Sequence, residues 1–529
     1  MRTLLSQEAD QVRADEAADE AAADDGGGGR RHPRGLYALY FYLWGAERMV
    51  VPMPMTSLST GSRSLVVVGA GYGGLSTAIR AQELGASATV LEATPTTPAW
   101  SNSRMSGARW HIAYLSPNAG ADRLAAEIMA VTGGTARPDV LAAFVRDAPR
   151  AFGWIQCHGA RFINLKGARV MTPVRPNRTD EVWPGRAGEV VLAGMQREFV
   201  ARGGRLLQEH RAIELRWPDG RVAGVVAETA SGERVRVEGS AVVLADGGFQ
   251  GNAELMRDVG RIPRPDLLVT RGAGSGRGDA LQMAMDAGAL IASPEAIYGH
   301  MLHRDALTDR RISQYPMLDK MSLGSVVVAG DARRFYDEQL GGLAGANRIA
   351  HLEDPSNVWL VFDREVWERE ARLDQIVPPN PNLAIKHARI VRAETPEELA
   401  ERTGLPGDAL ARTLDEFNAA AATGRLRELA IPRGGSPRPL RAPLYAVPLT
   451  VGVTHTFGGP VVDGHARVLD REERPIPGLY AVGSASAGLS GGPNPGYVGG
   501  VSVAVGLALL AAEHAVAGIV GSTKHDGAA

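Results

Sequence analysis

The stretch SLVVVGAGYGGLSTAIRAQELGASATVLEA, residues 64–93, decides the fold. It opens with the apolar run Leu65–Val68, which predicts a buried parallel strand. The spacing Gly-x-Gly-x-x-Gly follows at positions 69–74, and helical periodicity then continues until Gly85. A second apolar strand ends at Glu92. This succession of strand, turn, helix and strand predicts a unit that binds a dinucleotide.

Each glycine of the turn has a separate physical task. Gly69 permits the tight turn, Gly71 lets the backbone approach a pyrophosphate, and Gly74 lets the helix pack on the strand. The N-terminus of the helix offers free N–H groups to the phosphates. Glu92 is placed to accept hydrogen bonds from ribose hydroxyls, and its charge would repel a 2′-phosphate, which disfavours NADP. The turn alone does not distinguish FAD from NAD.

Composition narrows the class of protein. The chain has 529 residues, of which 44% are hydrophobic, and this suggests a large core and two or three domains. Lys plus Arg (57) nearly equals Asp plus Glu (59), so no nucleic-acid partner is expected. Cys157 is the single cysteine, which excludes an intrachain disulfide and a cysteine-based metal site. We expect a buried structural thiol, no metal, and a cytoplasmic location.

The two ends of the chain differ in character. Residues 1–60 begin with acidic residues, alanine and glycine, and we expect a disordered extension. There are two alternatives. Leu36–Trp44 could belong to an export signal, or the true start codon could be at Met53 or Met55 and the given start lie upstream of it. The apolar run Tyr497–Ala512 is shorter than the roughly 20 residues that a membrane span needs, so it predicts a buried helix.

Further strand signals lie far from the first turn. Residues 203–252 alternate strand-like stretches with turns and end in an apolar strand closed by Asp246-Gly247-Gly248. Another short strand, Leu479–Val482, precedes a glycine-rich loop near the C-terminus. The predicted fold class is therefore α/β, with a Rossmann-type nucleotide-binding domain split in sequence around an inserted α+β capping domain. The expected parts are residues 61–255 and 446–516 for the nucleotide, residues 256–445 for the substrate, and a flexible tail, residues 517–529.

At these residues the chain resembles the flavoprotein subunits of fumarate reductase and succinate dehydrogenase. That superfamily also includes 3-ketosteroid Δ1-dehydrogenases and tricarballylate dehydrogenase. The resemblance covers roughly residues 64–516, and its parts follow the order of the family. They are the Rossmann turn with Glu92, SNSRMSG at 101–107, VVLADGGFQGN at 242–252, GRGDALQMAMDAGA at 276–289, ARRFYDE at 332–338, THTFGG at 454–459 and PIPGLYAVGSAS at 475–486.

The resemblance implies FAD rather than NAD. It also implies non-covalent FAD, because no histidine occupies the pattern that families with covalent flavin use. The residues expected to contact the cofactor come from the turn, the matching segments and the loop before the last helix. They are Gly69, Ala70, Gly71, Gly73, Gly74, Glu92, Ala93, Asn102, Ser103, Ser106, Gly107, Asp246, Gly247, Gly248, Gly278, Asp279, Gly483, Ser484, Gly499 and Val501.

The implied activity is that of a dehydrogenase or reductase acting on a C–C bond beside a carbonyl or carboxylate. Such chemistry needs a base for the α-proton, a hydride acceptor and groups that hold the developing enolate. The resemblance points to a small carboxylate or ketone as substrate and leaves the electron acceptor open. The expected catalytic residues are His455, Tyr497, Asn494, Arg334 and His300, and Tyr298 and His303 are expected nearby.

Several positions depart from the family pattern or have a second interpretation. Tyr497 stands where fumarate reductases carry an arginine, Arg348 is displaced from the place of their proton-delivering arginine, and Asn494 replaces a tyrosine of ketosteroid dehydrogenases. Arg334 could instead pair with Asp337 or Glu338, and His455 could cap a turn. An FAD monooxygenase and a non-catalytic flavin-binding protein are the alternative functions.

Overall fold

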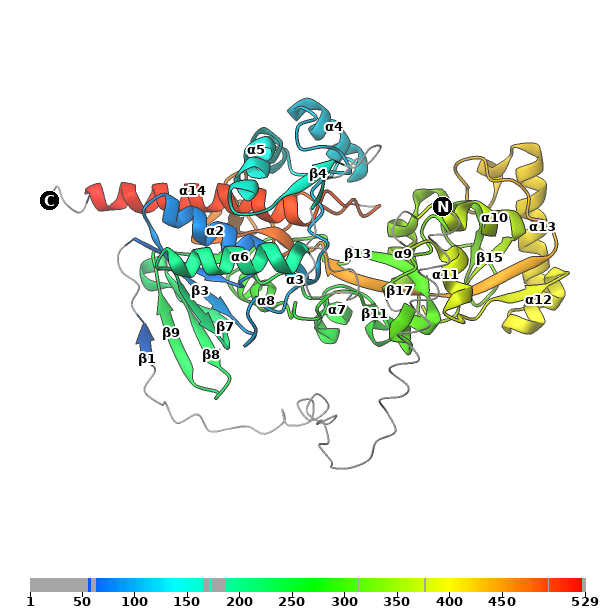
Figure 1. The fold of residues 1–529 in the computed structure, drawn as a ribbon, viewed down its shortest axis with the longest axis horizontal. Coiled ribbons are helices and arrows are strands. Elements are labelled where there is room, and N and C mark those ends of the chain that lie inside the picture. The colour runs from blue at the N-terminus through cyan, green and yellow to red at the C-terminus, as the bar shows by residue number, and fades with distance from the viewer. Residues whose placement is uncertain are drawn as a thin grey trace, which may run out of the picture. The chain divides into compact units, whose positions relative to one another are not determined.

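The computed structural model of the chain describes residues 56–58, 63–164, 171–173, 187–312, 314–374, 377–492 and 494–525 (Figure 1). Most of the predicted N-terminal extension lies outside these residues. Its residues Thr56–Leu58 form strand β1, which pairs in parallel with β9 (Arg234–Glu238). These three residues therefore belong to a sheet rather than to a disordered extension.

The sheet that carries the glycine turn has six strands. β2 is flanked by β3 and β10, all neighbours in the sheet are parallel except the β19–β20 pair, and every residue of β2 is buried. Strands from both ends of the chain thus share one sheet, as the split nucleotide-binding fold requires. Their order is β19 (Arg467–Leu469), β20 (Pro475–Ala481), β10 (Ala241–Leu244), β2 (Ser64–Val68), β3 (Ser87–Glu92) and β6 (Arg205–Gln208).

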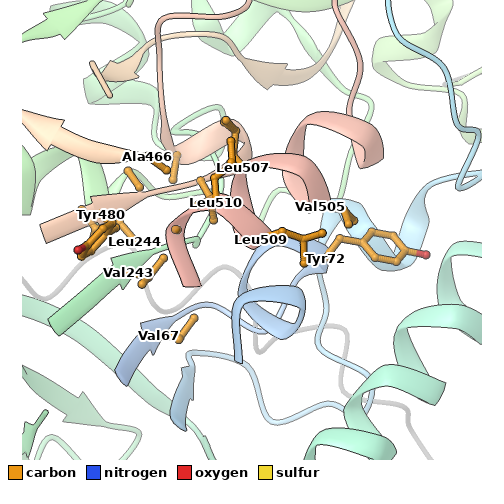
Figure 2. Close-up of a cluster of buried hydrophobic side chains, with 14 of the residues drawn as sticks. Val67, Tyr72, Val243, Leu244, Ala466, Tyr480, Val505, Leu507, Leu509 and Leu510 are labelled. Carbon is orange, nitrogen blue, oxygen red and sulfur yellow. The ribbon is translucent and has the colours of Figure 1, made fainter. Parts of the chain in front are cut away.

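Apolar helices cover this sheet. Helix α2 (Tyr72–Glu83) contacts both α6 (Ala187–Ala201) and α14 (Val501–His525), and α14 also contacts α5 (Pro138–Cys157). Figure 2 shows side chains of β2, β10 and β20 meeting those of α14 in one buried cluster. Burial of these side chains supplies the main driving force for folding here.

Helix α14 is apolar over most of its surface. Its segment Val501–Ile519 is long and apolar enough to cross a membrane, and 72% of that segment is buried inside the protein. Helices that are hydrophobic all round occur both in protein cores and in membranes. The expectation of no membrane span stays a prediction. The helix continues to His525, so the predicted tail is helical from residue 517 as far as residue 525.

The second large sheet is built around the long strand β17 (Leu444–Thr456), drawn in orange in Figure 1. Its partners include β13 (Ile297–His303) and β15 (Val358–Asp363), both antiparallel to it. Trp359, Phe362 and Phe417 belong to the separate core of this part. The sheet and its helices also include β11 (Val269–Thr270), β14 (Val326–Val328), β16 (Val391–Ala393), α9 (Gly342–Ala350), α10 (Arg364–Glu368), α11 (Pro379–Ile385), α12 (Pro396–Thr403) and α13 (Gly407–Thr423).

Smaller elements complete the described residues. A four-stranded sheet has the order β1, β9, β8 and β7, with the last two strands antiparallel to each other. The remaining bounds are β7 (His210–Leu215), β8 (Gly224–Thr229), α3 (Asn102–Met105), α4 (Ala121–Val131), β4 (Phe162–Asn164), β5 (Met171–Pro173), α7 (Ala253–Asp258), α8 (Asp279–Asp286), β12 (Ile291–Ala292) and β18 (Gly459–Pro460).

Cys157 lies at the C-terminal end of α5 and is exposed. The prediction of a buried structural thiol is therefore wrong. The sequence around it, GWIQCHG, mixes apolar and polar residues at a helix end. A shift of one residue around the helix axis there changes whether a side chain faces the core or the solvent.

The contact between α2 and β2 yields the first testable prediction. A Cβ atom at Gly74 would lie 1.8 Å from the Gly69 carbonyl oxygen, whereas a Cβ at Gly153 in α5 meets no atom within 4 Å. Gly74→Ala should therefore lower the free energy of unfolding by about 3 kcal/mol or more. Gly153→Ala, the control, should raise it by about 0.5–1 kcal/mol. Denaturant unfolding measures both, and equal stability of the two variants would contradict the close contact.

Candidate active site

A cavity of about 470 Å³ begins at the glycine turn and continues to the strands of the second sheet. This volume lies in the range of roughly 300–1,000 Å³ that is usual for small-molecule sites. Most residues predicted to bind the cofactor line it. They are Gly69, Ala70, Gly71, Gly73, Glu92, Ala93, Asn102, Ser103, Ser106, Gly107, Asp246, Gly247, Gly248, Asp279, Gly483, Ser484 and Val501.

Local hydrogen bonds hold the turn in place. The backbone N–H of Gly69, which has φ of +100°, donates to the Leu91 carbonyl at 2.7 Å. The N–H of Tyr72, the first residue of α2, donates to Ser103 Oγ at 3.0 Å. A Cβ at Gly71 would approach only the Ser103 side chain. The backbone at Gly71 is therefore open toward the cavity, as the approach of a pyrophosphate requires.

Gly74, Gly278 and Gly499 do not line this cavity, so their predicted cofactor contacts are not supported. Their lack of a side chain is explained by packing instead. A Cβ at Gly499 would lie 2.2 Å from Ser502 Oγ, and one at Gly278 would lie 2.6 Å from a methyl group of Leu255.

Two carboxylates line the nucleotide end of the cavity. Glu92 accepts hydrogen bonds from the Ala70 N–H at 3.0 Å and the Thr94 N–H at 2.9 Å, which fixes its carboxylate beside the turn. Asp246 accepts from the Ala280 N–H through Oδ2 at 3.0 Å, while its buried Oδ1 has no partner among the described residues. Burial raises the pKa of Asp246 to about 7. An unpartnered buried acceptor facing the cavity fits a ligand with hydroxyl donors, such as the expected FAD.

Asn102 lines the cavity, as predicted for a cofactor-binding residue, and it also positions a neighbouring strand. Its amide nitrogen donates to the Thr454 carbonyl at 2.6 Å, and its amide oxygen accepts from the Ala273 N–H at 2.7 Å. Both polar atoms thus tie the loop after β3 to β17, the strand that carries His455. Asn102 lines the cavity, but these bonds give its side chain a positioning role.

The second sheet brings aromatic side chains together at the far end of the cavity. Tyr298 of β13 pairs in register with His455 of β17, and their ring centroids lie 5.0 Å apart. Tyr497 stacks on Tyr298 at 4.0 Å with an interplanar angle of 23°. His300, two residues along β13, lies 5.1 Å from Tyr298. All four side chains line the cavity, so three of the predicted catalytic residues and the neighbour Tyr298 are brought together.

Burial sets the protonation of this cluster. It lowers the pKa of His455 to about 4, so the imidazole is neutral at neutral pH. Burial raises the pKa of both Tyr298 and Tyr497, so their hydroxyls stay protonated. The cluster offers neutral hydrogen-bond donors and acceptors.

His300 has an acidic partner that sequence motifs did not reveal. Its Nδ1 lies 2.5 Å from Asp319 Oδ2, and Asp319 Oδ1 accepts from the Met301 N–H at 2.9 Å. In the neutral imidazole this pairing places the proton on Nδ1 and leaves Nε2 as an acceptor. Asp319 lies in YPMLDKM, which carries no motif for this role.

Other functional candidates also escaped sequence reasoning. His111 and Tyr114 stack at 4.6 Å and line the cavity. Burial and then the charge of Arg109 lower the pKa of His111 to about 4. Arg109 and Arg271 line the same cavity. Arg109 lies two residues after the matched segment at residues 101–107, and the resemblance of SNSRMSGAR to the corresponding loop of tricarballylate dehydrogenase does single it out from the sequence.

Three predicted site residues lie elsewhere. Arg334 is buried and forms an ion pair with Glu338 at 2.6 Å, which is its alternative structural role. His303 is buried and lies 2.9 Å from the Arg389 carbonyl oxygen through Nε2. Asn494 is exposed, and none of the three lines the cavity. Their assignment to the substrate site is corrected accordingly.

Curated relatives and solved structures give independent comparisons. The chain is 26% identical over 84% of its length to NADH:fumarate oxidoreductase of Klebsiella pneumoniae, covering 46% of that protein. It is 32% identical over 59% of its length to 4-oxocyclohex-2-ene-1-carboxylate 5-dehydrogenase of Sinomonas cyclohexanicum, covering 56% of that protein. The chain thus spans about half the length of these two relatives.

The fold matches that of the 3-ketosteroid Δ1-dehydrogenase from Sterolibacterium denitrificans, with a TM-score of 0.65 and 21% identity. The match covers 86% of this chain and 100% of that one. A model of the FAD binding domain family matches residues 64–503. Together with the glycine turn, the open face of Gly71 and the unpartnered Asp246 oxygen, this match shows that the chain belongs to the FAD binding domain family and that its cofactor is FAD.

Proposed function

We propose that the protein is an FAD-dependent oxidoreductase that removes or adds hydrogen across a C–C bond beside a carbonyl or carboxylate. The observation that carries this proposal is the continuity of one cavity, from the turn at Gly69–Gly71 to the cluster of Tyr298, His300, His455 and Tyr497. The names of both curated relatives, a fumarate oxidoreductase and an oxocyclohexenecarboxylate dehydrogenase, support the same class of reaction.

The chain's own residues supply binding and proton transfer in this proposal. Bound FAD accepts or donates the hydride. Neutral His455 and the protonated hydroxyls of Tyr298 and Tyr497 hydrogen-bond the substrate carbonyl and its developing negative charge. His300, held through Nδ1 by Asp319, moves the α-proton at Nε2.

The division of the chain into functional parts belongs to the same proposal. The expected parts are residues 61–255 and 446–516 for the cofactor and residues 256–445 for the substrate, and we propose one change to these bounds. Because β17 extends the second sheet as far as Thr456, we place the second boundary after β17. Non-covalent attachment of FAD and a cytoplasmic location stay predictions.

Anaerobic titration tests the proposed reaction. The yellow protein is mixed with 4-oxocyclohex-2-ene-1-carboxylate, and the chemically reduced protein is mixed with fumarate. We expect one of the two reagents to change the flavin redox state, which the visible spectrum records. Consumption of oxygen driven by NADPH, with a hydroxylated product, would instead indicate a monooxygenase. A flavin that responds to no carbonyl or carboxylate compound would indicate a non-catalytic flavin protein.

The position of Gly71 in the turn yields a prediction about the FAD content of a variant. Gly71→Val should yield folded protein without FAD, because the side chain extends into the cavity where the pyrophosphate approaches. Gly153→Val in α5 is the matched control and should retain FAD, although β-branching lowers its helix propensity. Acid-released flavin measured per mole of protein checks both. Full FAD occupancy in Gly71→Val would refute the position assigned to the pyrophosphate.

Substitution of His455 should change the rate of flavin reduction without changing the FAD content. His455→Asn should keep FAD and slow anaerobic flavin reduction by about a hundredfold, because one preorganised donor to a developing oxyanion contributes roughly 3 kcal/mol. The exposed His465 supplies the control substitution His465→Asn, which should react at the original rate. If His455→Asn instead loses FAD while the loaded fraction reacts normally, the residue is structural.

The lowered pKa of His455 also predicts an acid dependence of stability. The unfolded chain takes up a proton below about pH 6.5, whereas the folded imidazole takes it up only near pH 4, so stability falls as the pH drops between these values. His455→Asn should remove about 2 kcal/mol of the stability difference between pH 7 and pH 5. Denaturant unfolding at both pH values measures this difference, and His465→Asn should leave it unchanged. An unchanged difference in His455→Asn would mean that folding does not lower the pKa of His455.

A further inference from the structure

Arg271 presents a positive charge to the aromatic end of the cavity. It directly follows β11, and its backbone N–H donates to the Val453 carbonyl at 2.8 Å, two residues before His455. Its guanidinium donates to Thr454 Oγ1 at 3.2 Å and to the Gln314 carbonyl at 3.3 Å. It also lies 5.1 Å from the centre of the Tyr315 ring. These contacts orient the guanidinium without neutralising it.

Within the described part of the chain, no carboxylate lies within ion-pair distance of Arg271. Other arginines with structural tasks do have such partners. Arg334 and Arg433 share the buried Glu338 at 2.6 and 2.5 Å, and Arg211, which lines the same cavity, pairs with Asp279 at 2.5 Å. Arg271 therefore differs from the arginines that the fold itself uses.

Three carboxylates near the cavity are already engaged, and a fourth, Asp246, has an unpartnered oxygen. Glu92 is bonded to the turn and to Thr94, Asp279 is bonded to Arg211, and Asp319 is bonded to His300. Arg109, which also lines the cavity, likewise has no ion pair among the described residues. Positive charge therefore accumulates beside the tyrosine cluster, where the low dielectric strengthens its attraction for an anion.

We propose that Arg271 binds a carboxylate of the substrate, and that the natural substrate is consequently a carboxylic acid rather than a neutral ketone. A planar guanidinium presents paired donors that match the two oxygens of a carboxylate. Arg271 lies beside His455, so it anchors the acid while the histidine and the tyrosines contact the reacting part. This inference rests on the proposed function and assigns its substrate class.

The FAD phosphates are the competing anion for Arg271. They are expected at the turn around Gly69–Gly71, whereas the guanidinium of Arg271 contacts Thr454, Gln314, Tyr315 and Met317. The two roles make different predictions. Loss of a substrate anchor weakens the acid and spares FAD, whereas loss of a phosphate ligand lowers the FAD content of the purified protein.

The test compares an acid with its neutral ester. Anaerobic flavin reduction is followed with 4-oxocyclohex-2-ene-1-carboxylate and with its methyl ester. In Arg271→Gln, the half-saturating concentration of the acid should rise by on the order of tenfold to a hundredfold, which is usual for the loss of a charge-assisted hydrogen bond. The half-saturating concentration of the ester and the FAD content should stay unchanged. Arg271→Lys should recover part of the acid's affinity.

Arg264→Gln is the matched control, because Arg264 pairs with Asp266 on the surface and does not line the cavity. It should leave both half-saturating concentrations unaltered. An ester that saturates the original protein as well as the acid does, or an Arg271→Gln protein that loses FAD and keeps the acid's affinity, would overturn the inference. Both outcomes would leave the proposed reaction standing.

A binding measurement covers the case in which neither compound reduces the flavin. Cyclohexanecarboxylate, which lacks the ketone, is titrated against the oxidised protein while the visible flavin spectrum is recorded. We expect a saturable spectral change in the original protein and a strongly weakened one in Arg271→Gln. The same change in both proteins, or none in either, would overturn the inference independently of the reaction.

Discussion

The contact of Gly74 with the Gly69 carbonyl determines where α2 begins relative to β2. This close approach brings the first turn of the helix to the carboxyl end of the strand, so its free N–H groups face the cavity beside Gly71. Glu92 on the neighbouring strand then reaches the Ala70 N–H, which ties the second strand to the same turn. The nucleotide end of the site is thus built from local sequence, within thirty residues.

The reacting end depends on contacts between distant parts of the chain. The register of β13 against β17 places Tyr298 opposite His455, although the two strands are separated by most of the inserted part. Asn102 then bonds to Thr454 and Ala273, which holds this pair of strands near the loop after β3. Tyr497 reaches the same cluster from the loop before α14 and stacks on Tyr298. The geometry for chemistry therefore exists only after both ends of the chain have joined one sheet.

This difference explains what could be predicted from the sequence. The turn and the strands at both ends of the chain follow from short patterns with local physical causes, and the structure joins these strands in one sheet. His455 was expected only from the family resemblance, and the structure places it in the cavity lining. Arg334 was misassigned because its motif does not show which way the side chain points. In the structure it points to Glu338. Asp319 and Arg271 lie outside every motif, and their roles arise from the pairing of strands and loops that no periodicity encodes. The proposed shift of the second boundary has a similar reason, because β17 belongs to the second sheet as far as Thr456.

A positive charge at the substrate end of the cavity has to come from residues outside the aromatic cluster. Burial keeps His455 neutral and keeps the hydroxyls of Tyr298 and Tyr497 protonated, so none of the three carries charge at neutral pH. Tyr497 stands at the place where the resemblance to fumarate reductases leads us to expect an arginine, and its ring packs against Tyr298. A neutral cluster could bind the carbonyl of a ketone. It would not offset the free-energy cost of removing a charged carboxylate from water. Arg109 and Arg271 both line the cavity without an ion pair among the described residues, and Arg271, which neutral partners orient beside this cluster, is the one that we propose to bind the anion.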